Sequence, residues 1–90
     1  MKVAVIGQGY VGLTISTFAS EYFEVIGFDS NQKVVAALNQ GNSHIEGVSN
    51  SDLLRAIETN KYRATFLESE ISDCNVVIIA VPTPLTKDRQ

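Results

Sequence analysis

The segment Gly7-Gln8-Gly9-Tyr10-Val11-Gly12 constrains the fold of this chain more than any other feature. It follows Lys2–Ile6, a β-branched apolar run without polar alternation, which is typical of a parallel strand that is covered on both faces. From Tyr10 onward the apolar residues recur at helical spacing. A strand, a G-x-G-x-x-G turn and a helix in succession predict the opening unit of a doubly wound α/β sheet. The inward face expected for this helix consists of Val11, Ile15, Phe18 and Tyr22.

The same alternation continues along the chain. We expect a second strand at Glu24–Phe28, and a second helix that Ser30 or Asn31 caps and Gly41 stops. The inward residues of that helix are Val34, Val35 and Leu38. The next stretch, 42–50, is predicted to be a polar loop over Ile45 and Val48, followed by a helix that starts at Ser49 or Ser51 and carries Leu53, Leu54 and Ile57. After that helix the pattern predicts a strand at 64–67 and a polar turn or short helix at 68–73. A buried strand at 76–81 follows, which Pro82 and Pro84 end.

Strands that alternate with helices pair in parallel, and right-handed crossovers then place helices on both faces of the sheet. The predicted fold class is therefore α/β, a Rossmann-type doubly wound parallel sheet. It is a partial one, because about four strands are expected where a complete dinucleotide fold has about six. We expect residues 1–90 to be the N-terminal portion of a NAD(P)-binding Rossmann domain within a longer protein. The strand at 76–81 would then have an exposed edge, which predicts association between isolated chains.

Charge and cysteine content exclude several classes of protein. Ten acidic and seven basic residues give a net charge of −3, which argues against nucleic acid and membrane surfaces as partners. Cys74 is the single cysteine, so the sequence offers no internal disulfide and no cysteine-based metal site. No apolar run approaches the roughly 18 residues of a membrane span, and no signal peptide is evident. A cytoplasmic location is expected.

Each glycine of the turn has a separate expected task. Gly7 permits the tight turn, Gly9 lets the backbone approach a pyrophosphate, and Gly12 lets the helix pack closely on the strand. The helix N-terminus then offers free N–H groups to the phosphates. Asp29 ends the next strand, 22 residues after Gly7, where a carboxylate accepts hydrogen bonds from the adenosine ribose and repels a phosphate. NAD is therefore favoured over NADP, although Lys33 lies close in sequence.

Two alternative interpretations of this turn stay open. The glycines and Asp29 can be purely structural, and the ligand can be another adenosine compound, such as S-adenosylmethionine or FAD. Thr83 lies between two prolines after the last strand, where it either contacts the cofactor or belongs to a rigid turn. The residues interpreted as structural or solvated are Cys74, His44, Glu68, Glu70 and Asp73.

Three stretches, MKVAVIGQGYVGLTIS, GFD with NQKVV, and NVVIIAVPTPL, resemble the opening of the UDP-glucose/GDP-mannose dehydrogenase family. The G-Y-V-G-L segment from Gly9 and the V-P-T-P segment around Thr83 are its most specific marks. Within that family, V-P-T-P-L and H-I-E-G-V-S are more similar to the UDP-N-acetylhexosamine 6-dehydrogenases, which act on glucosamine, mannosamine or galactosamine derivatives, than to the UDP-glucose enzymes.

The resemblance implies oxidation of a sugar C6 hydroxyl to a carboxylate in two steps, with two NAD reduced, for surface polysaccharide synthesis. It implies that residues 7–12 bind the pyrophosphate, that Asp29 binds the ribose, and that Thr83 contacts the cofactor. Lys33 is the nearest match to a basic residue of the family beside the ribose. The family's catalytic residues and UDP-binding domain would follow Gln90, so we expect no catalytic residue and no activity in residues 1–90 alone. A UDP-sugar substrate and a homodimer or higher homo-oligomer are implied for the whole enzyme.

Two alternatives to this function remain. One is a stand-alone dinucleotide-binding or regulatory module that senses NAD without chemistry, and the other is the NAD domain of a UDP-glucose 6-dehydrogenase. A hydroxy acid or glycerol phosphate dehydrogenase shares the opening but is disfavoured by V-P-T-P. The part of the protein after Gln90 would separate an enzyme from a binding module.

Overall fold

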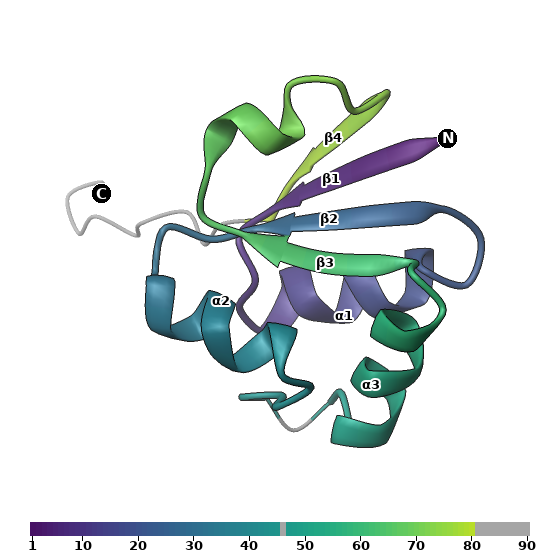
Figure 1. Ribbon diagram of the computed structural model, residues 1–90, viewed down its shortest axis with the longest axis vertical. Helices are drawn as coiled ribbons and strands as arrows, with labels where there is room; N and C mark the ends of the chain where they lie inside the picture. The colour runs from purple at the N-terminus through teal and green to yellow at the C-terminus, as the bar shows by residue number, and fades with distance from the viewer. Residues whose placement is uncertain (46, 81–90) are drawn as a thin grey trace, which may run out of the picture.

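The computed structural model describes residues 1–45 and 47–80 of the 90-residue chain. Figure 1 shows a fanned sheet with helices packed beneath it. In chain order the elements are β1 (Lys2–Ile6), α1 (Tyr10–Ala19), β2 (Glu24–Phe28), α2 (Gln32–Asn39), α3 (Asn50–Glu58), β3 (Tyr62–Thr65), the short 3-10 helix η1 (Glu68–Ile71) and β4 (Val76–Ile79).

The strands form one parallel sheet in the order β3-β2-β1-β4. The register sets Val5 of β1 beside Gly27 of β2 on one side and beside Ile78 of β4 on the other. Helices α1, α2 and α3 lie on one face of the sheet, and η1 lies on the opposite face (Figure 1). The predicted α/β doubly wound fold is confirmed, with the α-helices of the described residues gathered on one face.

The core lies between the sheet and the three helices. Leu13, Leu38 and Leu53, one from each helix, are fully buried. They pack with apolar residues of the strands, because alternate strand residues point to the same face of a sheet. Val48 is buried beneath the loop as predicted. Among the residues described, no helix combines the length and the apolar character that crossing a membrane requires.

Local capping chemistry explains where the second and third helices begin. The Asn31 side chain accepts hydrogen bonds from the N–H groups of Lys33 and Val34, which fixes the first turn of α2. The Ser49 side chain accepts from the N–H of Asp52 in the same way at α3. Both caps are among the residues predicted from the sequence.

The predicted inward face of α1 is wrong at three of its four residues, whereas Ile15 is partly buried and packs against the core. Val11, Phe18 and Tyr22 are 56%, 66% and 63% exposed, and the last lies beyond the helix end. The buried face consists instead of Gly12, Leu13 and Ser16. Glycine occupies position 12 of this face because α1 packs closely against the turn that precedes it there.

Two strand predictions need correction. The strand predicted at 64–67 begins at Tyr62 and ends at Thr65, because it pairs with β2 from Val25, opposite Tyr62, to Phe28, opposite Thr65. The strand predicted as buried at 76–81 is an edge strand, in which Val77 and Ile79 are 53% and 73% exposed. It pairs only with β1 within the described residues, so the expected exposed edge is confirmed. Association through this edge stays a prediction.

Candidate functional site

The strand order reverses its direction of growth at β1. The chain adds β2 and then β3 on one side of β1, and it then crosses to add β4 on the other side. In open α/β sheets, ligands bind outside the carboxyl ends of the strands at such a switch point. The turn from Gly7 to Gly12 follows β1, and Ala80 follows β4, so both lie at this switch point. The topology therefore places the G-x-G-x-x-G segment where a ligand site is expected.

The three glycines of the turn meet three different constraints. Gly7 has a φ of +95°, in the left-handed region that favours glycine. A Cβ on Gly12 would lie 1.6 Å from the Gly7 carbonyl oxygen, so only glycine fits at this contact between helix and turn. Gly9 has a negative φ of −80°, and a Cβ there would meet no protein atom within 4 Å. No contact in the described residues requires glycine at position 9. The close approach of a ligand to the backbone would explain why a glycine is present there.

The N-terminus of α1 is open to an anion. Gly9 is the N-cap residue, and in the described part of the chain the helix has neither a side-chain cap nor an acidic residue in its first turn. The first N–H groups of a helix have no partner within the helix, and they lie at the positive end of its dipole. Tyr10 and Val11 extend outward beside them and are largely exposed. This donor set fits a phosphate group.

Asp29 is joined to the turn by hydrogen bonds. Its Oδ2 accepts from the backbone N–H of Gln8 at 2.9 Å, and its Oδ1 accepts from the N–H of Asn31 at 2.9 Å. Its own N–H donates to the Thr65 carbonyl at 3.0 Å. The half-buried carboxylate is thus fixed beside the start of the glycine turn, and each oxygen keeps a lone pair for a further donor. This arrangement suits the two hydroxyls of a ribose.

The three other residues predicted to contact the cofactor are Gln8, Lys33 and Thr83. The Gln8 side chain is fully buried and turned into the protein, so only the backbone of Gln8 borders the site. A contact of Gln8 with the cofactor through its backbone stays a prediction. Lys33 is exposed in the first turn of α2, and no ion pair joins it to Asp29 in the described ranges. Thr83 lies outside the described residues.

The residues expected to be structural or solvated show no second reactive centre. Cys74 is partly buried, and this burial raises the pKa of its thiol and so disfavours the thiolate. Glu70 pairs with Arg63, which lowers the pKa of the carboxyl, and Asp73 pairs with Lys2. His44 is exposed. Residues 1–45 and 47–80 hold no group of three or more metal-binding side chains.

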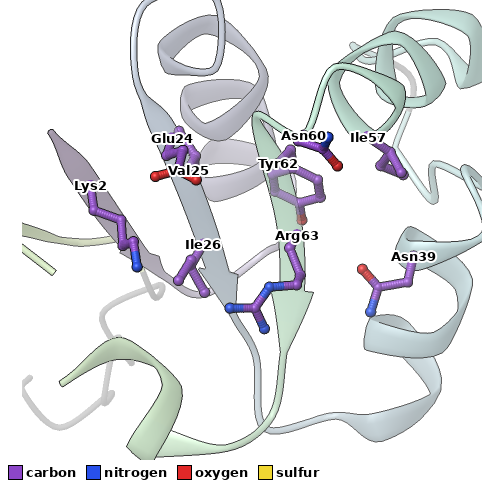
Figure 2. A pocket seen from close by; sticks show the side chains of 9 residues that line it. All are labelled: Lys2, Glu24, Val25, Ile26, Asn39, Ile57, Asn60, Tyr62 and Arg63. Carbon is purple, nitrogen blue, oxygen red and sulfur yellow. The ribbon is translucent and has the colours of Figure 1, made fainter. Parts of the chain in front are cut away.

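A shallow depression elsewhere on the molecule is not part of this site. Figure 2 shows its lining side chains, which include Lys2, Tyr62 and Arg63. Lys2 and Tyr62 are the first residues of β1 and β3, whereas the glycine turn follows the last residue of β1. The depression therefore lies at the amino ends of the strands, opposite the switch point.

Sequence reasoning missed two residues next to the turn. Ser16 and Tyr62 are buried, and both donate hydrogen bonds to the Gln8 side chain. Hydrophobic periodicity gives no signal for such polar contacts, because it scores only apolar positions. The available hints are the polar Gln8 between two glycines and the glycine at position 27 within the second strand.

Comparisons with known proteins agree with this geometry. Residues 1–90 match the model of the UDP-glucose/GDP-mannose dehydrogenase family, NAD binding domain. The chain is 38% identical over 90 residues to UDP-N-acetyl-D-glucosamine 6-dehydrogenase of Pseudomonas aeruginosa, with 100% of this chain and 21% of the relative covered. It is 43% identical over 89 residues to UDP-N-acetyl-D-mannosamine dehydrogenase of Campylobacter jejuni, with 97% and 21% covered.

A solved structure from the same family also aligns with this chain. A ternary complex of GDP-mannose dehydrogenase from Pseudomonas aeruginosa aligns with a TM-score of 0.91 at 30% identity, covering 100% of this chain and 21% of that one. The chain thus spans about a fifth of the length of the proteins it matches.

Proposed function

Because the chain belongs to the UDP-glucose/GDP-mannose dehydrogenase family and matches its NAD-binding domain, we propose that it forms the adenosine-binding half of the NAD site in a nucleotide-sugar 6-dehydrogenase. The observation that carries the proposal is the pairing of the glycine turn with Asp29 at the switch point of the sheet. The turn offers N–H donors at the start of α1, and the Asp29 carboxylate lies beside it, with Oδ2 2.9 Å from the backbone nitrogen of Gln8. These are the two partners that a pyrophosphate and an adenosine ribose need.

The residues of this chain would bind and orient the cofactor rather than react. The N–H groups at the start of α1 would bind the pyrophosphate, and the missing side chain at Gly9 would let it approach the backbone. Asp29 would accept hydrogen bonds from the ribose hydroxyls, and its charge would disfavour the 2′-phosphate of NADP. Lys33 and Thr83 complete the proposed contacts. NAD supplies the hydride acceptor for the oxidation.

The proposed substrate is a UDP-N-acetylhexosamine whose C6 hydroxyl becomes a carboxylate. The support is that relatives at 38% and 43% identity carry the names of N-acetylglucosamine and N-acetylmannosamine enzymes. Oxidation of the C6 alcohol to a carboxylate releases four electrons and takes its second oxygen atom from water, so two NAD are reduced to NADH and three protons are released for each sugar. We further propose a cytoplasmic homo-oligomer that supplies uronic acids for surface polysaccharide.

The test uses the complete protein that contains this chain. It is incubated with NAD, or with NADP for comparison, together with one sugar nucleotide at a time. The sugar nucleotides are UDP-N-acetylglucosamine, UDP-N-acetylmannosamine, UDP-glucose and GDP-mannose, and the formation of NADH or NADPH is followed by absorbance. We expect two NADH for each UDP-N-acetylhexosamine consumed and little reduction of NADP. Turnover of UDP-glucose alone would contradict the proposed substrate. NAD binding without turnover of any sugar would indicate a binding module and contradict the enzyme.

A further inference from the structure

One buried polar side chain beside the site has no role in the proposed chemistry. Gln8 is fully buried, and its amide group makes four hydrogen bonds. Its Nε2 donates to the carbonyl oxygens of Val5 and Gly7 at 3.1 and 2.9 Å. Its Oε1 accepts from the hydroxyls of Ser16 and Tyr62 at 3.1 and 2.8 Å. Both donors and both lone pairs of the amide are therefore used.

These bonds join parts of the chain that are distant in sequence. Ser16 lies on α1, Tyr62 begins β3, and Gln8 itself lies in the glycine turn. Burial raises the pKa of the Tyr62 hydroxyl, and the nearby charge of Asp29 adds to the shift, so Tyr62 stays a protonated donor. The turn is thus held from two sides by elements of the core.

The glycine at position 27 of β2 leaves room for the hydrogen bonds around the Gln8 amide. A Cβ on Gly27 of β2 would lie 2.3 Å from Gln8 Oε1 and 2.8 Å from the Tyr62 hydroxyl oxygen. Glycine is unfavourable in the middle of a strand, so its presence at position 27 has a specific cause. That cause is the amide group packed against β2.

The same residue holds the ribose-binding carboxylate. The backbone N–H of Gln8 donates to Asp29 Oδ2 at 2.9 Å, while the Gln8 side chain fixes where that peptide group lies. We propose that Gln8 is a positioning residue, whose buried amide aims its own N–H at Asp29 and so sets the carboxylate for recognition of the adenosine ribose. The inference rests on the proposed function, because it assigns Asp29 its ribose contact.

The experiment compares two ligands in the complete protein that contains this chain. Calorimetric titration gives the affinity for NAD and for its 2′-deoxyadenosine analogue, which lacks the hydroxyl that Asp29 would bind. In the unsubstituted protein we expect NAD to bind about tenfold more tightly, the usual scale of one hydrogen bond to a charged group. Gln8→Met keeps the side-chain length but removes the amide, so we expect the ratio to fall to about twofold or less. Tyr62→Phe removes one of the four anchoring bonds, so its ratio should also fall.

The matched control is Asn39→Leu. Asn39 also bonds the backbone of another element through its amide, with Nδ2 donating to the Ala64 carbonyl and Oδ1 accepting from the Ala64 N–H, both at 2.9 Å. It has no hydrogen bond to Asp29 within the described residues. Its loss should lower the melting temperature without changing the ratio of affinities.

The outcomes separate the two proposals. An unchanged ratio in Gln8→Met would overturn the positioning role, and if that variant does not fold, an unchanged ratio in Tyr62→Phe would do the same. An equal fall of the ratio in Asn39→Leu would also overturn it, because lost stability would then explain the effect. Failure of the unsubstituted protein to bind NAD would overturn the proposed function itself.

Discussion

Gly12→Ala should lower the free energy of unfolding by about 3 kcal/mol or more. The added methyl group would lie 1.6 Å from the Gly7 carbonyl oxygen and 3.4 Å from the Ala80 side chain. The first of these neighbours is backbone, which no rotamer change can move aside. Helix α1 would have to move away from β1, and the packing of Leu13 beneath the sheet would move with it. Denaturant unfolding of the complete protein measures the change.

A variant with the same added methyl group serves as the control. Gly9→Ala places that group where no protein atom lies within 4 Å, so the free energy of unfolding should change by less than about 0.5 kcal/mol. Equal destabilisation by the two variants would contradict the packing described for the turn.

Gly9→Ala should instead weaken NAD binding by about 10- to 100-fold. The methyl group would be on the N-cap residue of α1, where the proposed pyrophosphate approaches the backbone. A displaced phosphate loses at least one hydrogen bond to a charged group, worth about 1.5–3 kcal/mol, and 1.4 kcal/mol corresponds to tenfold in affinity. Titration of NAD into the folded variant gives this number directly.

Position 47 offers a comparison for that variant. A Cβ on Gly47 would make only ordinary contacts with Tyr10 and Thr14, at 3.7 Å or more, and Gly47 itself lies in a loop outside the glycine turn. Gly47→Ala should therefore keep both stability and NAD affinity. If Gly9→Ala binds NAD as tightly as the unsubstituted protein, then the cofactor does not approach the backbone at Gly9.

The local elements of the fold could be predicted because their signals are local. The first two strands follow from uninterrupted apolar runs, and the start of α2 follows from Asn31, whose side chain caps the two N–H groups that it can reach. The roles of Gly7 and Gly12 also follow from the motif, since its spacing fixes where the turn and the helix contact each other.

The wrong predictions concern contacts between distant parts of the chain. Hydrophobic periodicity selected Val11 and Phe18 for the buried face of α1, but that face needs the small Gly12 and the polar Ser16. The residue that begins β3, Tyr62, pairs with Val25 of β2 and donates a hydrogen bond to Gln8, 54 residues earlier, and no local window contains either contact. Val77 and Ile79 lie on one face of β4, and their exposure depends on which elements cover that face, which the apolar pattern alone does not give.

The same division applies to the candidate site. Asp29 could be identified because it ends a strand at a set distance from the glycines, and the structure joins it to the turn. The burial of Gln8 could not, because a polar side chain between two glycines is usually expected to face solvent. Its partners come from α1 and β3, so its role becomes visible only when the three elements are placed together.

The most direct measurement is calorimetric titration of NAD and NADP into the complete protein and into its Asp29→Ala variant. The account predicts that NAD binds well, that NADP binds poorly, and that the loss of Asp29 weakens NAD by about 10- to 100-fold. The preference for NAD over NADP should narrow in the variant, because the carboxylate that repels the 2′-phosphate is gone. Equal binding of NAD by the two proteins would contradict the assignment of Asp29 to the ribose, and no binding by either would contradict the cofactor site itself.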